Sequence, residues 1–200
     1  MHPRIAGLPP VDWTAARSQA AYDPADSTLT LTAAAGVDWT NDLLGGEPQH
    51  RASALAFTAP ASFSLSARVL VVSPRTTFDA GVLALWADSD HWAKLCFEYS
   101  PQGEAMVVSV VTNAHSDDSN GPVVTAPWTY LRVSRVGPAW AFHSSGDGRD
   151  WSFVRLFRLD TEKPVNVGFM SQAPTGQSCV ARFDCIQFTE QSPENLRDGS

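Results

Sequence analysis

The residues with the most chemical potential lie in the stretch Trp92–Tyr99, within a longer segment, 80–112, that reads as three apolar runs separated by short polar breaks. Side chains alternate along a strand, so every second residue of this stretch would share a face. One face would carry Trp92, Lys94, Cys96 and Glu98. An indole ring stacks on a sugar, and charged groups bond its hydroxyls. The pattern therefore predicts one of two things: a ligand-binding surface, or a solvent-exposed sheet face on which charged side chains of neighbouring strands pair with one another.

Other residues could extend this surface from neighbouring segments. Trp86, Thr112 and Arg132 lie in adjacent predicted strands, and the long irregular stretch 34–51 contains Trp39 and His50. A loop of this length in a compact domain is often functional, although Trp39 could equally pack into the core and His50 lie at the surface. The candidate ligand-binding residues are Trp39, His50, Trp86, Trp92, Lys94, Glu98, Thr112 and Arg132.

Glu98 is the candidate catalytic residue if the protein is an enzyme. Glycosidases use two carboxyl groups about 5–10 Å apart, one as an acid and the other as a nucleophile or base. Glu98 has no second carboxylate on its own predicted strand, and Glu104 lies beyond the following turn. The missing pair favours binding over hydrolysis, with no catalytic residue.

The segment Asn113–Pro122 is polar and reads as a loop. Its residues His115–Asp118 contain the side-chain types of a hydrolase triad, but triads are normally assembled from distant segments, which favours a self-capped turn. Asp117 and Asp118 leave open a Ca²⁺ site, although their spacing matches no specific calcium motif. Cys96, Cys179 and Cys185 lack metal-ligand spacing. We expect no metal and no cofactor.

The elements that must position these residues are short strands. Alternating apolar patterns recur at short, regular intervals, as in Phe63–Val71 and Trp128–Arg135, and no helical pattern exceeds two turns. About a dozen such strands predict an all-β fold, a sandwich of two antiparallel sheets of jelly-roll type. Within 15–21 the sequence allows one helical turn. We expect a single domain over 1–200 with a frayed tail at 190–200.

Composition and charge exclude several classes of partner. The 200 residues are 44% hydrophobic and 18% charged, which is typical of an ordered globular protein, and their net charge is −7. An acidic chain without a basic patch favours neither nucleic acid nor an anionic membrane as partner. Three cysteines without framework spacing, and the lack of an apolar run of signal-peptide or membrane length, predict a cytoplasmic protein with reduced thiols. Sheet edges allow a homodimer.

Several motifs occur in the order found in a known family. They are AGVLALWADSDHWAKLCFEY, VSVVTNAHSDDSNGP, YLRVSRVGPAWAFHSSGDGRDWSFVR and VGFMSQAPTGQSCVARFDCIQF, with VDWTNDLL as a weaker element. Over about 38–188 they resemble the DUF1349 family. The resemblance implies a concanavalin A-like lectin/glucanase sandwich and a relation to a yeast protein described as a regulator of enolase. Asp118 stands where the family usually has Trp, and His143 where it has Tyr, which weakens an aromatic platform there.

Three functional hypotheses follow. The first is a non-catalytic module that binds a carbohydrate or polyol on the concave sheet. The second is a glycoside hydrolase or lyase with Glu98 as acid or base. The third, implied by the resemblance alone, is a regulatory protein that binds a metabolic enzyme.

Overall fold

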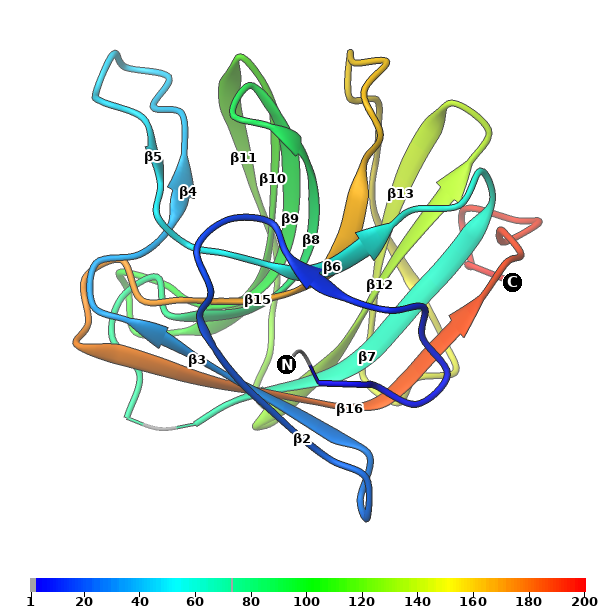
Figure 1. The fold of residues 1–200 in the computed structure, drawn as a ribbon, viewed down its shortest axis with the longest axis horizontal. Coiled ribbons are helices and arrows are strands. Elements are labelled where there is room, and N and C mark those ends of the chain that lie inside the picture. Colours follow the sequence, from blue (N-terminus) through cyan, green and yellow to red (C-terminus); the bar gives the residue numbers. More distant parts are fainter. Residues whose placement is uncertain (1–2, 73) are drawn as a thin grey trace.

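Strands account for all the regular structure in the computed structural model, which describes residues 3–72 and 74–200 (Figure 1). Within these ranges there is no helix, so the prediction of an all-β fold is confirmed and the helical turn predicted within 15–21 is wrong. Part of that stretch belongs to a strand instead. No helix in the described residues is long and apolar enough to cross a membrane.

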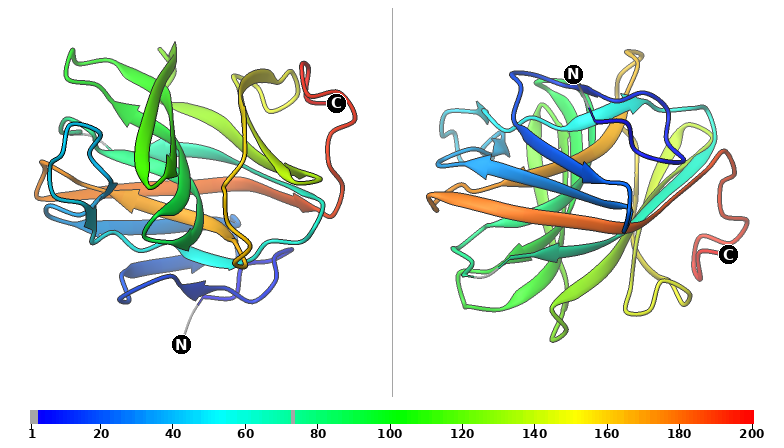
Figure 2. Two further views of the ribbon diagram at one scale, coloured as in Figure 1. Left: turned by 90° about the horizontal axis from the view of Figure 1, so that it is seen from above. Right: turned by 60° about the horizontal axis from the view of Figure 1, so that its bottom comes forward.

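Two seven-stranded antiparallel sheets form the molecule, as predicted (Figures 1 and 2). In spatial order, sheet A contains β1 (Asp12–Trp13), β6 (Leu55–Thr58), β15 (Asn166–Gln172), β8 (Ala80–Asp88), β9 (His91–Tyr99), β10 (Ala105–Asn113) and β11 (His115–Val123). Sheet B contains β14 (Ser152–Phe157), β13 (Ala139–Ser145), β12 (Trp128–Val136), β7 (Phe63–Val71), β16 (Ser178–Thr189), β3 (Thr28–Ala34) and β2 (Gln19–Asp23). A separate two-stranded ribbon joins β4 (Trp39–Thr40) to β5 (Gln49–His50).

The main core lies between the sheets, where their alternating apolar side chains meet. The predicted inward face of β9 is confirmed, because Ala93, Leu95 and Phe97 are buried in this core. The sheets pack tightly at Gly81 of β8, where a Cβ atom would lie 2.5 Å from Val69 Cγ1. Glycine at this position therefore lets β7 and β8 pack together.

A second apolar cluster covers the outer face of sheet A. Residues 37–54 cross this face and bring Trp39 onto Trp86 and Trp92, with ring centroids 4.6 and 5.8 Å apart. The Trp39 indole N–H donates a 2.8 Å hydrogen bond to the Ala52 carbonyl, which holds the crossing segment in place. Trp92 is consequently 0% exposed, so the prediction that it forms an open stacking surface is wrong.

The polar segment predicted as a loop at Asn113–Pro122 is largely the edge strand β11. It pairs with β10 in antiparallel register, with Asp118 opposite Val110 and Ser116 opposite Thr112. β11 is paired on one side only, and most of its side chains are exposed. Its sequence is therefore polar and lacks the apolar alternation by which a strand is predicted.

The C-terminal residues 190–200 form no strand and lie against β12 and β13 of sheet B (Figure 1). His143 Nε2 donates to the Leu196 carbonyl at 2.8 Å, and the Arg197 guanidinium lies 4.8 Å from the ring centroid of Phe153. The cysteines Cys96, Cys179 and Cys185 are all free.

Candidate functional site

A small pocket of about 210 Å³ opens on the outer face of sheet A. Its floor comes from β9, β10 and β11, and its wall comes from the segment 37–54 that crosses the sheet. The lining residues are Asp38, Trp39, Thr40, Phe78, Lys94, Glu98, Val108, Val110, Ser116, Asp118 and Gln172. Three of the predicted ligand-binding residues, Trp39, Lys94 and Glu98, are therefore brought together here.

Lys94 fastens the covering segment to the sheet. Its ammonium group is buried and donates to Asp38 Oδ1 at 2.6 Å, to the Trp39 carbonyl at 2.8 Å and to Gln172 Oε1 at 3.0 Å. Burial alone would lower the pKa of Lys94, but the adjacent carboxylate of Asp38 raises it overall. An ammonium group has three donors, and all three are used. Lys94 therefore has no donor left for a ligand.

The Glu98 carboxyl group, in contrast to the Lys94 ammonium group, still has hydrogen-bonding capacity for a ligand. It is 9% exposed, and the Gln172 amide donates to its Oε2 over a long 3.4 Å. Within residues 3–72 and 74–200 no hydrogen bond reaches its other oxygen. Burial raises the pKa of Glu98 to about 7; Lys94 and Arg75 lower it, and the charges of Asp38 and Asp118 raise it. At neutral pH this carboxyl group can both accept and donate a hydrogen bond.

Asp38 and Asp118 are two further carboxylates that the sequence analysis did not place in the site. Asp118 projects from β11 at the rim of the pocket, one strand beyond Val110, which in turn pairs with Lys94. Asp118 is exposed at the rim, and desolvation by the neighbouring protein raises its pKa above the ordinary value, against the opposing effect of Lys94. The signal that could have revealed it is the spacing of Ser116 and Asp118, two residues apart, as on one face of a strand.

Thr112, Trp86 and His50 lie beside the pocket and do not line it. Thr112 is buried, with its hydroxyl 3.0 Å from Ser116 Oγ. The His50 ring lies 5.6 Å from Trp86, and its Nε2 is 2.7 Å from Asn41 Oδ1. Burial lowers the pKa of His50. These residues support the crossing segment by packing and hydrogen bonding.

Arg132 belongs to β12 of sheet B and not to this site. Its guanidinium donates to the Gly199 carbonyl at 2.6 Å and lies 4.2 Å from the ring centroid of Trp151. Burial lowers its pKa to about 10. The prediction that Arg132 shares a cleft with Lys94 and Glu98 is wrong, because alternation assigns a residue to a face of its strand but not to a sheet.

The described residues contain no group of three His, Cys, Asp or Glu side chains placed to hold a metal ion. Asp117, one of the two aspartates considered for Ca²⁺, forms a 3.0 Å ion pair with Arg155.

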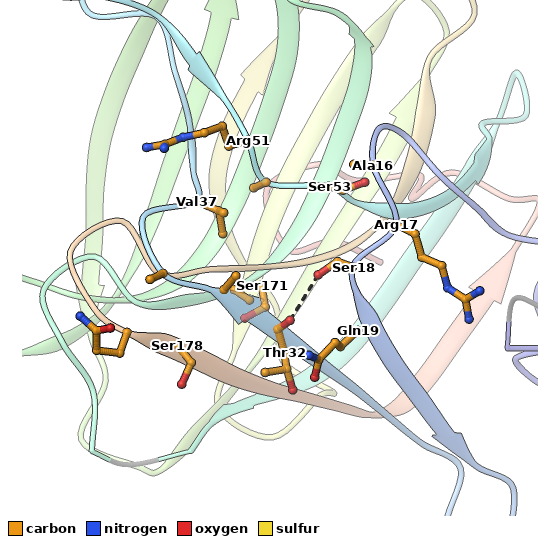
Figure 3. A pocket seen from close by; sticks show the side chains of 15 residues that line it. Ala16, Arg17, Ser18, Gln19, Thr32, Val37, Arg51, Ser53, Ser171 and Ser178 are labelled. Atoms are coloured by element: carbon orange, nitrogen blue, oxygen red, sulfur yellow. Dashed lines mark hydrogen bonds between the residues drawn. The ribbon is translucent and has the colours of Figure 1, made fainter.

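A larger hollow of about 600 Å³ lies between β2, β3 and the start of the crossing segment (Figure 3). Serine and threonine side chains line much of it, and the Ser18 hydroxyl donates to the Thr32 carbonyl at 3.2 Å. Figure 3 shows the Arg17 and Arg51 side chains extending in different directions. Charged groups therefore do not converge here as they do around Glu98.

Comparisons with known proteins agree with this architecture. Residues 13–191 match the model of DUF1349, described as a protein of unknown function. A search of curated proteins found no match. A functionally unknown protein from Saccharomyces cerevisiae is 25% identical, with a TM-score of 0.79 over 90% of this chain and 96% of that one.

Two further solved structures share the fold at lower identity. A xylan β-1,4-xylosidase from Bacillus halodurans is 15% identical, with a TM-score of 0.67 over 95% of this chain but 40% of that one. The carbohydrate-binding module CBM66 from Bacillus subtilis is 8% identical, with a TM-score of 0.52 over 88% of this chain and 94% of that one.

Proposed function

The chain belongs to the DUF1349 family, whose description gives no function, and we propose that it is a non-catalytic module that binds a carbohydrate or polyol in the pocket around Glu98. The observation that carries this proposal is the largely buried Glu98 carboxyl group, which lines the pocket and accepts one long hydrogen bond, from Gln172, within the described residues. A ligand hydroxyl can donate a hydrogen bond to this carboxyl group without displacing a protein partner.

The size and lining of the pocket indicate the class of ligand. Its volume of about 210 Å³ is below the roughly 300–1,000 Å³ typical of sites for drug-sized molecules, so one sugar ring or a short polyol would fill it. Val108, Val110 and Phe78 offer apolar contacts to C–H groups, while Glu98 and Asp118 offer acceptors to hydroxyls. A sugar or polyol presents both C–H groups and hydroxyls, so this combination of apolar and acidic side chains suits it.

The structural neighbours support the proposal by analogy only. CBM66 is described as a carbohydrate-binding module, and the xylosidase contains a region of the same fold. Function on a shared fold is decided by the site, and the pocket of this chain is built from its own crossing segment and β11.

Titration of the protein with a panel of monosaccharides and polyols, followed by NMR or calorimetry, tests the proposal. We expect millimolar binding that weakens about tenfold in Glu98→Gln, because an amide loses the charge-assisted hydrogen bond. The control is Glu104→Gln on the exposed turn after β9, which should bind as the wild type does. Failure of the whole panel to bind in the millimolar range would contradict the proposal.

A second candidate function is that of a glycoside hydrolase or a polysaccharide lyase, with Glu98 as acid or base. The observation that favours it is the pKa of about 7 at Glu98 together with a second carboxyl, Asp118, on the same pocket. Screening chromogenic glycosides and polysaccharides with the wild type, Glu98→Gln and Asp118→Asn decides it. Activity that survives Glu98→Gln would remove this residue from the mechanism.

A homodimer through sheet edges and a cytoplasmic location are further proposals. They rest on the exposed edge strands, such as β2 and β14, and on the three free thiols. Light scattering of the purified protein and fractionation of the host cell test them separately.

A further inference from the structure

The ionisable groups of the pocket do not balance in charge. Asp38, Lys94, Glu98 and Asp118 are its ionisable lining residues, three carboxyl groups against one ammonium group. Asp38 lies 2.6 Å from the ammonium nitrogen and neutralises it. Glu98 and Asp118 are then left without an ion-pair partner in the part of the chain that the structure describes.

The neighbouring arginines act on the two carboxyl groups only from a distance and form no ion pair with either in the described residues. Arg75 donates to the backbone carbonyls of Asp79 and Phe97, at 3.1 and 2.9 Å, and lies over the Phe97 ring. Arg155 forms its ion pair with Asp117, on the opposite face of β11 from Asp118. Neither guanidinium lines the pocket.

We propose that this pocket prefers a sugar or polyol that carries an ammonium group over a neutral one, and that it disfavours a carboxylated one. This inference rests on the proposed function and names its ligand class. A ligand ammonium in the pocket can form a charge-assisted hydrogen bond with one of the two carboxyl groups, Glu98 or Asp118, and is attracted by the charge of the other. A ligand carboxylate meets two carboxyl groups and no free cationic donor, since Lys94 has spent its three protons.

The protonation of Glu98 fits this preference. Burial raises its pKa to about 7, so the empty pocket holds a partly protonated carboxyl group. An ammonium group next to it favours the ionised form and lowers that pKa again. Binding of an ammonium-bearing ligand near neutral pH therefore releases part of a proton from Glu98.

Four probes that differ in one group test the preference: glucosamine, glucose, N-acetylglucosamine and glucuronate, each titrated into the intact protein at neutral pH with NMR detection. We expect glucosamine to bind about tenfold more tightly than glucose, because a hydrogen bond to a charged group is stronger than a neutral one. N-acetylglucosamine should resemble glucose, and glucuronate should bind most weakly. The preference should vanish in Glu98→Gln and shrink in Asp118→Asn, while the control Glu104→Gln keeps it.

The outcomes separate this inference from the proposed function. If glucose binds as tightly as glucosamine, or glucuronate binds best, the charge preference is wrong and the sugar-binding role stands. If none of the four binds the wild type, both fail. A preference that persists in Glu98→Gln and in Asp118→Asn also overturns the inference, because the ammonium group is then recognised elsewhere. Asp118 is exposed, so its variant reports on the site even if Glu98→Gln alters folding.

Discussion

Replacing Glu98 with glutamine should make the protein more stable at neutral and alkaline pH. An ordinary glutamate has a pKa of 4.5, and burial raises that of Glu98 to about 7. Between these values the unfolded chain has lost the proton and the folded chain keeps it, so the free energy of unfolding falls as pH rises. One pKa unit corresponds to about 1.4 kcal/mol, which gives a loss of about 3 kcal/mol that is complete above pH 7.

Glutamine has the shape of glutamate but does not ionise, so Glu98→Gln avoids this loss. Urea unfolding at about pH 5 and about pH 8 measures the effect, since the difference between variant and wild type should grow by roughly 2–3 kcal/mol between the two. Glu104→Gln, on an exposed turn, controls for the loss of one negative charge. An equal difference at both pH values would refute the reasoning and indicate that Glu98 is not desolvated.

Two other substitutions test the attachment of the crossing segment and the packing between the two sheets. Lys94→Met should destabilise the fold by about 3 kcal/mol in chemical denaturation, because it leaves the Asp38 carboxylate unpaired at a site where it is 15% exposed. Gly81→Ala should cost about 1–3 kcal/mol in the same assay, because its Cβ would lie 2.5 Å from Val69 Cγ1 and 3.1 Å from the Cβ of Ala181.

Each of these has a matched control. Adding Asp38→Asn to Lys94→Met removes the unpaired charge and should recover part of the loss. A Lys94→Met protein as stable as the wild type would show that the ion pair does not hold the crossing segment. Gly137→Ala, at a turn with open space around its Cβ position but a φ of +59°, measures the backbone cost alone. A Gly81→Ala loss no larger than that one would contradict tight packing between the sheets.

Alternation was sufficient to predict the faces of strands. Leu95 and Phe97 lie in the core and Lys94 and Glu98 on the opposite face, as the period of two requires. Alternation does not state which sheet a strand joins, so Arg132 was placed in the wrong one. Nor does it show what covers a face, and for this reason the burial of Trp92 under the crossing segment was missed.

The carboxylate of Asp118 was missed for a related reason. The strand β11 is an edge strand, and its polar residues gain their order from pairing with β10, as at Val110 and Asp118. Such pairing is a long-range property that local composition does not encode. With Asp118 read as part of a loop, Glu98 appeared to be a solitary carboxylate.

The contacts of Lys94 with the crossing segment also bear on the order in which parts of the protein fold. Lys94 reaches Asp38 across 56 residues of sequence and Gln172 across 78, so neither contact forms until distant strands have been brought together. The strand β8 lies between β9, which carries Lys94, and β15, which carries Gln172, so the second contact needs these three strands to be paired first. We expect the pocket to assemble in the last kinetic phase, seen as a delayed quenching or shift of Trp39 fluorescence relative to backbone circular dichroism. Simultaneous signals would show that sheet and pocket form together.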